Sequence, residues 1–247
     1  METAFSLTDK TALVTGAGRG LGRAIAEALH AAGAHVVAVA RTQADLDSLA
    51  DTLGDRVTAM TGDVTSDAFI EGVAKLERLD ILINNAGANR PEPFAEVSRD
   101  NLDFILDLNV RSMFLTAQAA THVMAKNGED GGSIIHMSSQ MGHVGSPNRS
   151  VYCMTKHAIE GLTKAMAVEL APQNIRVNSV APTFIETPMT KPMLADPAFR
   201  AFVERMIPMQ KMGQPSDVAN AVVYLASGAS AMVTGHSLLI DGGWTAQ

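Results

Sequence analysis

The sequence predicts an α/β fold: one doubly wound parallel sheet of about seven strands, with helices on both faces. Short apolar runs rich in Val and Ile alternate with longer helical patterns along the 247 residues. Connections of helix length between strands favour parallel pairing through right-handed crossovers. Runs that are apolar at every or nearly every position, such as residues 35–40 (HVVAVA), are typical of strands buried on both faces. Such strands require helices on both sides of the sheet.

Each expected strand is a short apolar run, and each expected helix is a longer stretch with helical spacing of its apolar residues. The strands are expected at residues 11–15, 35–40, 56–61, 80–84, 133–138, 175–181 and 238–240, of which 56–61 is the weakest. The helices are expected at residues 20–32, 42–53, 66–76, 98–124, 151–170 and 216–226. The stretch 98–124 is compatible with one long helix or with two joined ones. No repeat, low-complexity tract or linker interrupts this order, so residues 1–247 are predicted to form one domain.

One segment departs from the regular alternation of strands and helices. Residues 186–214 carry four prolines and several methionines between a strand and a helix. Long excursions of this kind often serve as mobile lids over a substrate. A packed surface hairpin is the alternative interpretation of the same segment.

Composition and charge exclude several classes of protein. A net charge of −7 argues against a general binder of nucleic acid or of membrane surfaces. Cys153 is the only cysteine, which precludes an intrachain disulfide and fits a reducing compartment. Residues 1–10 lack an apolar run of signal-peptide length, and no window approaches the ~18 apolar residues of a spanning helix. We therefore expect a soluble cytoplasmic protein. Without a His/Cys cluster, we expect no metal.

A glycine-rich turn follows the first expected strand. Residues 15–22 read TGAGRGLG, the spacing T-G-x-x-x-G-x-G. Glycines let the backbone turn tightly and approach a pyrophosphate at the N-terminus of the next helix. On its own, the motif is also compatible with an ordinary glycine-rich turn.

Two further motifs stand where parallel strands end. Asp63 and Val64 follow the third expected strand, and residues 84–87 (NNAG) follow the fourth. Ligands of open α/β sheets bind at the carboxyl ends of the strands. Each motif alone would also suit a loop of turn-forming residues. Together with the glycine turn, they predict a nucleotide site.

With these motifs the chain resembles the short-chain dehydrogenase/reductase family, and in particular its sugar and polyol dehydrogenases and carbonyl reductases. The resemblance covers nearly the whole chain and implies a Rossmann-like sheet. It implies that the glycine turn holds the cofactor pyrophosphate, that Asp63 contacts adenine, and that the NNAG motif supports the sheet and the cofactor. Residues 182–187 (PTFIET) resemble the family's P-G-x-x-x-T, in which Thr holds the nicotinamide carboxamide. Thr183 stands where that motif has Gly.

The cofactor is predicted from the end of the second expected strand. Members of the family that prefer NAD end this strand with Asp or Glu, which bonds the ribose hydroxyls. Here Ala40 occupies that place, followed by Arg41, and Arg19 lies in the glycine turn. Two guanidinium groups suit a 2′-phosphate, which favours NADP. NAD is the alternative, because arginines at these places also occur in NAD users of the family.

Tyr152 and Lys156 form a Y-x-x-x-K pair on one helix face. A phenol has an ordinary pKa of about 10, and a nearby ammonium group favours the phenolate. We therefore expect Lys156 to lower the pKa of Tyr152. Tyr152 would then act as general acid and base, while hydride passes directly between the substrate carbon and the cofactor.

Two more polar residues complete the predicted catalytic set. The hydroxyl of Ser139, at the end of the fifth expected strand, suits the substrate oxygen. Asn109 lies inside an apolar helical stretch, where an amide is costly unless it is paired. In the family this residue binds a water that links the lysine to solvent. The predicted catalytic residues are Asn109, Ser139, Tyr152 and Lys156.

The predicted cofactor-binding set follows from these motifs. It consists of Gly16, Arg19, Gly20, Leu21, Gly22, Arg41, Asp63, Val64, Asn85, Ala86, Gly87, Tyr152, Lys156, Pro182 and Thr187.

The two loops that line the substrate in this family are polar here. They supply the predicted substrate residues Asn89, Arg90, Gln140, His143, Asn148, Arg149 and, after the sixth strand, Thr183. Such a lining suits a polyol, a sugar or a sugar acid better than a steroid or a long acyl chain. Alternatively, several of these side chains face solvent or a neighbouring subunit.

The predicted function is an NAD(P)-dependent interconversion of a secondary alcohol and a ketone. The enzymatic alternative is a 3-oxoacyl-[acyl-carrier-protein] reductase, which needs a basic patch; Arg90, Lys126 and Arg149 are the candidates for it. A non-catalytic nucleotide-sensing protein, or an inactive relative, is the alternative of another class, and none of the four catalytic residues is missing. The C-terminal region resembles the part of the family that forms homotetramers. We expect a small-molecule substrate and self-association, without nucleic acid or membrane partners.

Overall fold

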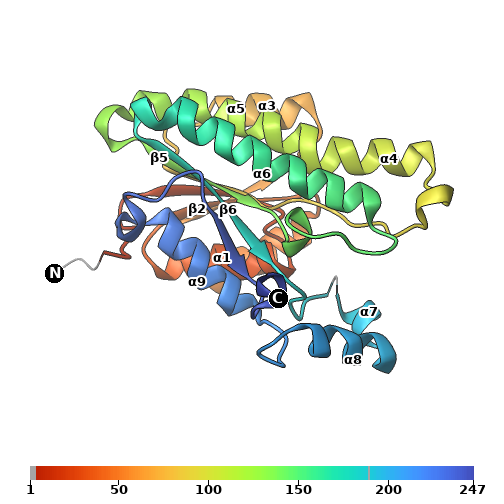
Figure 1. The fold of residues 1–247 in the computed structure, drawn as a ribbon. Helices are drawn as coiled ribbons and strands as arrows, with labels where there is room; N and C mark the ends of the chain where they lie inside the picture. Colours follow the sequence, from red (N-terminus) through yellow and green to blue (C-terminus); the bar gives the residue numbers. More distant parts are fainter. Residues whose placement is uncertain (1–3, 189) are drawn as a thin grey trace.

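The computed structural model describes residues 4–188 and 190–247, and it confirms the predicted fold class. The described strands form one parallel sheet in the order β3-β2-β1-β4-β5-β6-β7 (Figure 1). They are β1 (Thr11–Thr15), β2 (His35–Ala40), β3 (Val57–Thr61), β4 (Ile81–Asn84), β5 (Gly132–Met137), β6 (Ile175–Pro182) and β7 (Ser237–Ile240). The strand order reverses between β1 and β4, and ligands of doubly wound sheets bind at such a point.

Helices cover both faces of the sheet, in a Rossmann-like single domain (Figure 1). One face carries α1 (Gly20–Ala31), α2 (Gln43–Leu53) and α9 (Pro215–Ala226). The other face carries α3 (Asp67–Ala74), α4 (Arg99–Leu106), α5 (Ser112–Met124) and α6 (Ser150–Leu170). Two short helices, α7 (Lys191–Leu194) and α8 (Pro197–Met206), lie apart from these layers.

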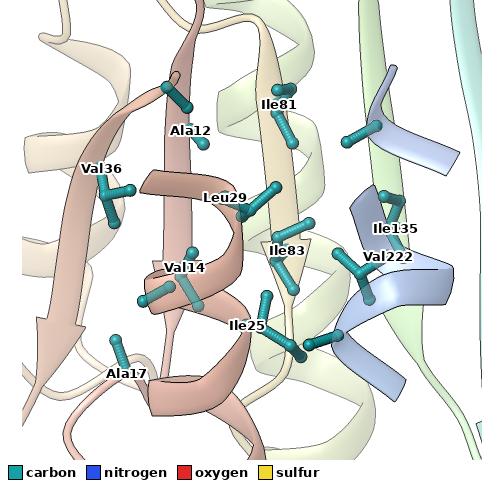
Figure 2. Close-up of a cluster of buried hydrophobic side chains, with 14 of the residues drawn as sticks. Ala12, Val14, Ala17, Ile25, Leu29, Val36, Ile81, Ile83, Ile135 and Val222 are labelled. Atoms are coloured by element: carbon teal, nitrogen blue, oxygen red, sulfur yellow. The ribbon is translucent and has the colours of Figure 1, made fainter. Parts of the chain in front are cut away.

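The strand register explains why the strands are apolar at successive positions. Val14 of β1 lies beside Ile83 of β4, and both belong to the core under α1 and α9 (Figure 2). The preceding residue, Leu13, lies beside Val37 and Leu82, and all three belong to the core on the other face. Successive side chains of a strand point to opposite faces, so a sheet with two cores needs apolar residues at both.

Side-chain caps set two helix starts one residue inside the predicted ones. The Ser66 hydroxyl accepts a hydrogen bond from the amide of Phe69, so α3 begins after Ser66. The Ser98 hydroxyl accepts one from the amide of Asn101, so α4 begins after Ser98. Each cap satisfies an amide that the first helical turn leaves unpaired.

The stretch 98–124, predicted as one helix or two joined ones, is two helices joined by a π-helical turn. The turn spans Asp107–Arg111 and connects α4 to α5 without a break. Single π-helical turns inside helices often mark functional sites. Here the turn contains Asn109, whose side chain is completely buried.

The segment 186–214, which we call the lid segment, is packed. The helices α7 and α8 bury Leu194 and Val203 in a third apolar cluster, and residue 189 lies outside the described residues. The cluster contains Met141, Phe184, Leu194, Val203, Ile207 and Met212, with Tyr152, Cys153, Phe199 and Trp244 packed against it. The lid segment therefore shares its core with the helix that carries Tyr152.

Among the described residues, no helix has the length and apolar character needed to cross a membrane.

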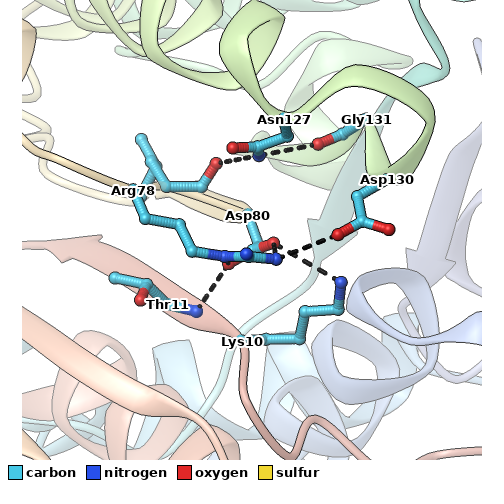
Figure 3. A network of polar contacts seen from close by, with 8 residues as sticks. Lys10, Thr11, Arg78, Asp80, Asn127, Asp130 and Gly131 are labelled. Carbon is cyan, nitrogen blue, oxygen red and sulfur yellow. Dashed lines mark hydrogen bonds and ion pairs between the residues drawn. The ribbon is translucent and has the colours of Figure 1, made fainter.

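A charged network fastens the amino ends of the two central strands (Figure 3). Asp80 is 4% exposed, and its carboxylate accepts hydrogen bonds from Arg78 at 2.8 and 2.9 Å and from the Thr11 amide at 2.9 Å. The ammonium nitrogen of Lys10 lies 3.4 Å from the same carboxylate. Burial alone would raise the pKa of Asp80, but these hydrogen bonds and charges outweigh it and hold the pKa below its ordinary value.

We predict that Asp80→Asn lowers the free energy of unfolding by about 2 kcal/mol at pH 7, because it removes charge-assisted hydrogen bonds to a buried group. The pKa of Asp80 is lower in the folded chain, so the difference from the parent should be complete above about pH 5 and shrink as the pH falls below about 4. Denaturant unfolding at several pH values measures it. Asp130→Asn is the control: Asp130 is an exposed partner of Arg78, so the loss should be below about 0.5 kcal/mol. Equal losses in both variants would contradict the assignment.

Candidate active site

A cavity of about 520 Å³ opens at the carboxyl ends of the strands, where the strand order reverses. Its volume lies in the range of small-molecule sites. Every residue of the predicted cofactor-binding set lines it, from the glycine turn at one end to Tyr152, Lys156 and Thr187 at the other. The sequence motifs therefore meet in one place.

The glycine turn has the shape that a bound pyrophosphate requires. Gly16 and Gly20 have φ values of +68° and +59°, which side chains disfavour. A Cβ on Gly22 would lie 2.1 Å from the carbonyl oxygen of Gly16, so only glycine lets α1 begin this close to the turn. The start of α1 thereby faces the cavity, and its free amides and helix dipole attract anions. These residues fit a dinucleotide.

Thr15 joins the glycine turn to the NNAG motif. Its hydroxyl oxygen accepts hydrogen bonds from the amides of Asn85 and Ala86, at 2.9 and 3.0 Å. The Asn85 side chain donates a hydrogen bond of 2.8 Å to the Thr15 carbonyl. The two motifs are therefore held as one rigid wall of the cavity.

The outer end of the cavity, away from Tyr152 and Lys156, carries charges of both signs. Arg19 and Arg41 are exposed and line it beside Asp63. Hydrogen bonds from the amide and hydroxyl of Thr65 lower the pKa of Asp63, and the charge of Arg41 contributes. Asp63 is therefore a carboxylate at neutral pH, and neither arginine forms an ion pair with a carboxylate among the described residues.

Asn109 lies behind the cavity and positions one of its loops. Its amide nitrogen donates to the Ala88 carbonyl at 2.8 Å, and its oxygen accepts from the Ala88 amide at 2.9 Å. The same nitrogen lies 3.3 Å from the hydroxyl of Thr155, which bonds the Tyr152 carbonyl. The π-helical turn thus connects the loop after NNAG to the helix that carries Tyr152.

Ser139, Tyr152 and Lys156 meet at the inner end of the cavity. Lys156 is 3% exposed, and its ammonium donates a hydrogen bond of 2.7 Å to the Met137 carbonyl at the end of β5. The ammonium nitrogen lies 5.4 Å from the centre of the Tyr152 ring. The Ser139 hydroxyl accepts a hydrogen bond of 3.1 Å from the Met141 amide and donates one of 3.5 Å to the Pro182 carbonyl.

The expected lowering of the Tyr152 pKa is wrong for the chain alone. Burial raises the pKa of Tyr152 to about 12, and the neighbouring Ser139 hydroxyl and the charge of Arg149 only partly oppose it. Burial also lowers the pKa of Lys156 to about 8, so the ammonium loses its proton before the phenol does. By itself the chain holds Tyr152 as a neutral phenol, which is a proton donor.

Four predicted substrate residues carry buried polar atoms that have no partner within the described part of the chain. Thr183 lines the cavity, and its hydroxyl is unpaired. Gln140 is 1% exposed, and both atoms of its amide are unpaired. The same holds for the side-chain oxygen of Asn89 and the Nε of Arg149. Buried polar groups rarely stay unpaired except where a water or a ligand completes them.

Of the seven predicted substrate residues only Thr183 lines the cavity, and three of the other six are exposed. Arg90 is exposed, and its guanidinium stacks 3.5 Å from the centre of the Phe104 ring. His143 is exposed and hydrogen-bonds the hydroxyl of Ser237 at 2.9 Å. Asn148 is exposed at a turn, with φ +60°. The alternative that some polar residues of these loops face solvent holds for these three.

Several cavity residues were not predicted. They are Gly18, Val39, Ala40, Thr42, Asp45, Gly62, Ala88, Leu108, Met137, Ser138, Ile185, Pro188 and Thr190. Most of them adjoin a predicted residue, so the motifs already pointed to their neighbourhood. Asp45 is different, because it comes from α2 and reaches the cavity by packing against Gly18. No motif marks such a contact.

A glycine turn and a Tyr/Lys pair in one cavity of a doubly wound sheet define a nicotinamide-dependent oxidoreductase. The sequence model of the family described as enoyl-(acyl carrier protein) reductase matches residues 16–245. The chain belongs to the short-chain dehydrogenase/reductase family, whose members act on CH–OH and carbonyl groups.

Sequence relatives align over nearly their whole length. L-xylulose reductase of Bos taurus is 41% identical over 241 residues, which cover 97% of this chain and 98% of the relative. The 2-dehydro-3-deoxy-D-gluconate 5-dehydrogenase of Bacillus subtilis (strain 168) is 38% identical over 250 residues, covering 99% and 98%. Among solved structures, a gluconate 5-dehydrogenase from Burkholderia cenocepacia J2315 in complex with NADP and tartrate has a TM-score of 0.93 at 32% identity, covering 99% and 98%.

We predict that Tyr152→Phe lowers kcat by about 10²- to 10⁴-fold, because it removes the proton donor. The cofactor should still bind, as measured by calorimetry. Tyr224→Phe is the matched control: it changes the other tyrosine of the chain, which packs near Phe5 outside the cavity. A Tyr152→Phe enzyme that keeps near-normal turnover would refute the proton-transfer role.

Proposed function

We propose that this enzyme interconverts a secondary alcohol and a ketone on a polyol, a sugar or a sugar acid, using NADP. The observation that carries the proposal is the inner end of the cavity, where Ser139, Tyr152 and the buried, unpaired hydroxyl of Thr183 line the same space. A hydroxyl-rich substrate supplies partners for such groups, whereas an apolar acyl chain or steroid does not. The names of the relatives support this class of substrate.

The charges at the outer end support NADP over NAD. Arg19 and Arg41 are the cations available for a 2′-phosphate, and Ala40 replaces the acidic residue that would bond free ribose hydroxyls. The Burkholderia relative was crystallised with NADP. Asp63 would hold the adenine, the glycine turn the pyrophosphate, and Thr187 the carboxamide.

In this proposal each catalytic residue has one task. Ser139 holds the substrate oxygen, and Tyr152 donates its proton to that oxygen during ketone reduction. A bound nicotinamide carries the hydride and, when oxidised, a positive charge. In alcohol oxidation Tyr152 must first lose its proton, and positive charge near the ring favours that loss. Asn109 fixes the loop after the NNAG motif through its two hydrogen bonds to Ala88. As in the family, it would also bind a water that links Lys156 to solvent.

Three broader features belong to the same proposal. The lid segment would close over the substrate, because its helices share an apolar cluster with Tyr152. The chain would act as a cytoplasmic homotetramer, in line with its single cysteine and the C-terminal resemblance.

The two alternative functions fit less well. A carrier-protein reductase needs a continuous basic patch, yet Arg90 stacks on Phe104, Arg149 is half-buried, and Lys126 follows α5 near the start of β5. A nucleotide sensor has no use for a catalytic set, yet Ser139, Tyr152 and Lys156 line one cavity.

Absorbance at the reduced-nicotinamide band tests the proposed function. Each of NADP and NAD is paired with polyols, sugars, sugar acids and 3-oxoacyl esters. Turnover of at least one polyol, sugar or sugar acid, with NADP preferred, is the expected result. Turnover confined to the acyl esters would overturn the substrate class.

We predict that Arg41→Asp lowers the ratio of kcat/KM with NADP to kcat/KM with NAD by about 10- to 100-fold, as expected for one charge-assisted contact to a phosphate. Arg99→Asp makes the same charge change at an exposed position at the start of α4, outside the cavity, and should leave the ratio unchanged. An unchanged ratio in Arg41→Asp would show that Arg41 does not distinguish NADP from NAD.

A further inference from the structure

Arg149 is a half-buried cation without a strong acceptor. It precedes α6 by one residue and Tyr152 by one helical turn. One guanidinium nitrogen donates to the Pro147 carbonyl at 3.3 Å, and another lies 3.5 Å from the thioether sulfur of Met193. The Nε is buried without a partner among the described residues. Burial lowers the pKa of Arg149, which expresses the cost of keeping this charge out of water.

Two other arginines of the chain, Arg176 and Arg78, have strong hydrogen-bond acceptors. Arg176 is also partly buried, but its guanidinium donates to one hydroxyl and three backbone carbonyls. Arg78 forms ion pairs with Asp80 and Asp130. In the described part of the chain Arg149 forms no ion pair. Its five donors suit a carboxylate, which can accept two of them at once.

The position of Arg149 relates this charge to the substrate. Arg149 is the last residue before α6, three positions before Tyr152, and its positive charge acts to lower the pKa of Tyr152. From there the Arg149 side chain reaches the lid segment, with its guanidinium carbon 5.9 Å from the centre of the Phe199 ring. The surrounding cluster of Met141, Phe184 and their neighbours is apolar. Arg149 thus offers a positive charge between the reacting centre and the lid segment.

We infer that Arg149 binds a carboxylate of the substrate, so that this enzyme acts on sugar acids in preference to neutral polyols. The inference rests on the proposed function, because it selects one member of the proposed substrate class. In a sugar acid the carboxylate is separated by several bonds from the carbon that exchanges hydride. An anchor three residues before Tyr152 matches that separation.

The experiment compares acids with the neutral alcohols that they most resemble. Gluconate and sorbitol differ only in carrying a carboxylate or a hydroxymethyl group at one end, and xylonate and xylitol form the same kind of pair. Oxidation of each compound with NADP gives kcat and KM for the parent enzyme, Arg149→Gln and Arg149→Lys. Arg205→Gln is the matched control, because Arg205 is an exposed arginine of α8 that also stacks on an aromatic ring, 5.8 Å from the centre of Phe202.

The parent enzyme should prefer the acid in at least one pair. Arg149→Gln should lower kcat/KM for that acid by about 10- to 100-fold more than for the neutral partner, with the extra loss mostly in KM. The loss of its charge beside Tyr152 lowers kcat on both substrates alike. Arg149→Lys keeps the charge but cannot bind a carboxylate through two parallel hydrogen bonds. Its kcat/KM for the acid should therefore lie between those of the parent and of Arg149→Gln. Arg205→Gln should behave like the parent. Calorimetric binding of NADP to each variant checks that it folds.

Two results would overturn the inference while the proposed function stands. One is a parent enzyme that prefers the neutral member of each pair. The other is an equal loss on acid and neutral substrates in Arg149→Gln, which would make Arg149 a brace for the lid segment. A parent enzyme that oxidises no polyol, sugar or sugar acid, yet oxidises another secondary alcohol, would instead refute the proposed substrate class itself.

Discussion

The site depends on one buried ammonium group. Lys156 donates its hydrogen bond to the carbonyl of Met137, the last residue of β5, and thereby ties α6 to the carboxyl end of the sheet. Because Tyr152 is one turn earlier on α6, the same bond places the phenol at the inner end of the cavity. Together with the bonds of Asn109 and Thr155, this contact fixes the ring relative to the nucleotide turn.

Burial of this pair sets the chemistry and also limits it. The pKa of Tyr152 rises to about 12 and that of Lys156 falls to about 8, so the free chain has a neutral phenol beside an ammonium group that is easily deprotonated. Such a phenol is ready to donate a proton to a ketone. To accept a proton from an alcohol it needs additional positive charge, and Arg149 already supplies part of it. The charges beside the ring thus decide whether Tyr152 is ready to donate a proton or to accept one.

The sequence predicts the fold well because each strand has to serve two cores. Leu13 and Val14 point to opposite faces, and the resulting apolar run is visible without coordinates. The motifs likewise predict the cofactor wall, since their residues are consecutive. Burial and packing are not visible in this way: the pKa of Tyr152 was expected to fall but rises, and Asp45 reaches the cavity only through the fold. The π-helical turn around Asn109 left no mark in the periodicity.

The most direct measurement is an ultraviolet titration of the Tyr152 phenol in a Tyr224→Phe background, where it is the only tyrosine. We expect no phenolate absorbance from the free protein below about pH 10, because burial holds the pKa near 12. With NADP in its oxidised form bound, we expect phenolate to appear below about pH 10, because the added positive charge favours it. An ordinary phenol titration in the free protein, or a titration that NADP leaves unchanged, would contradict the account.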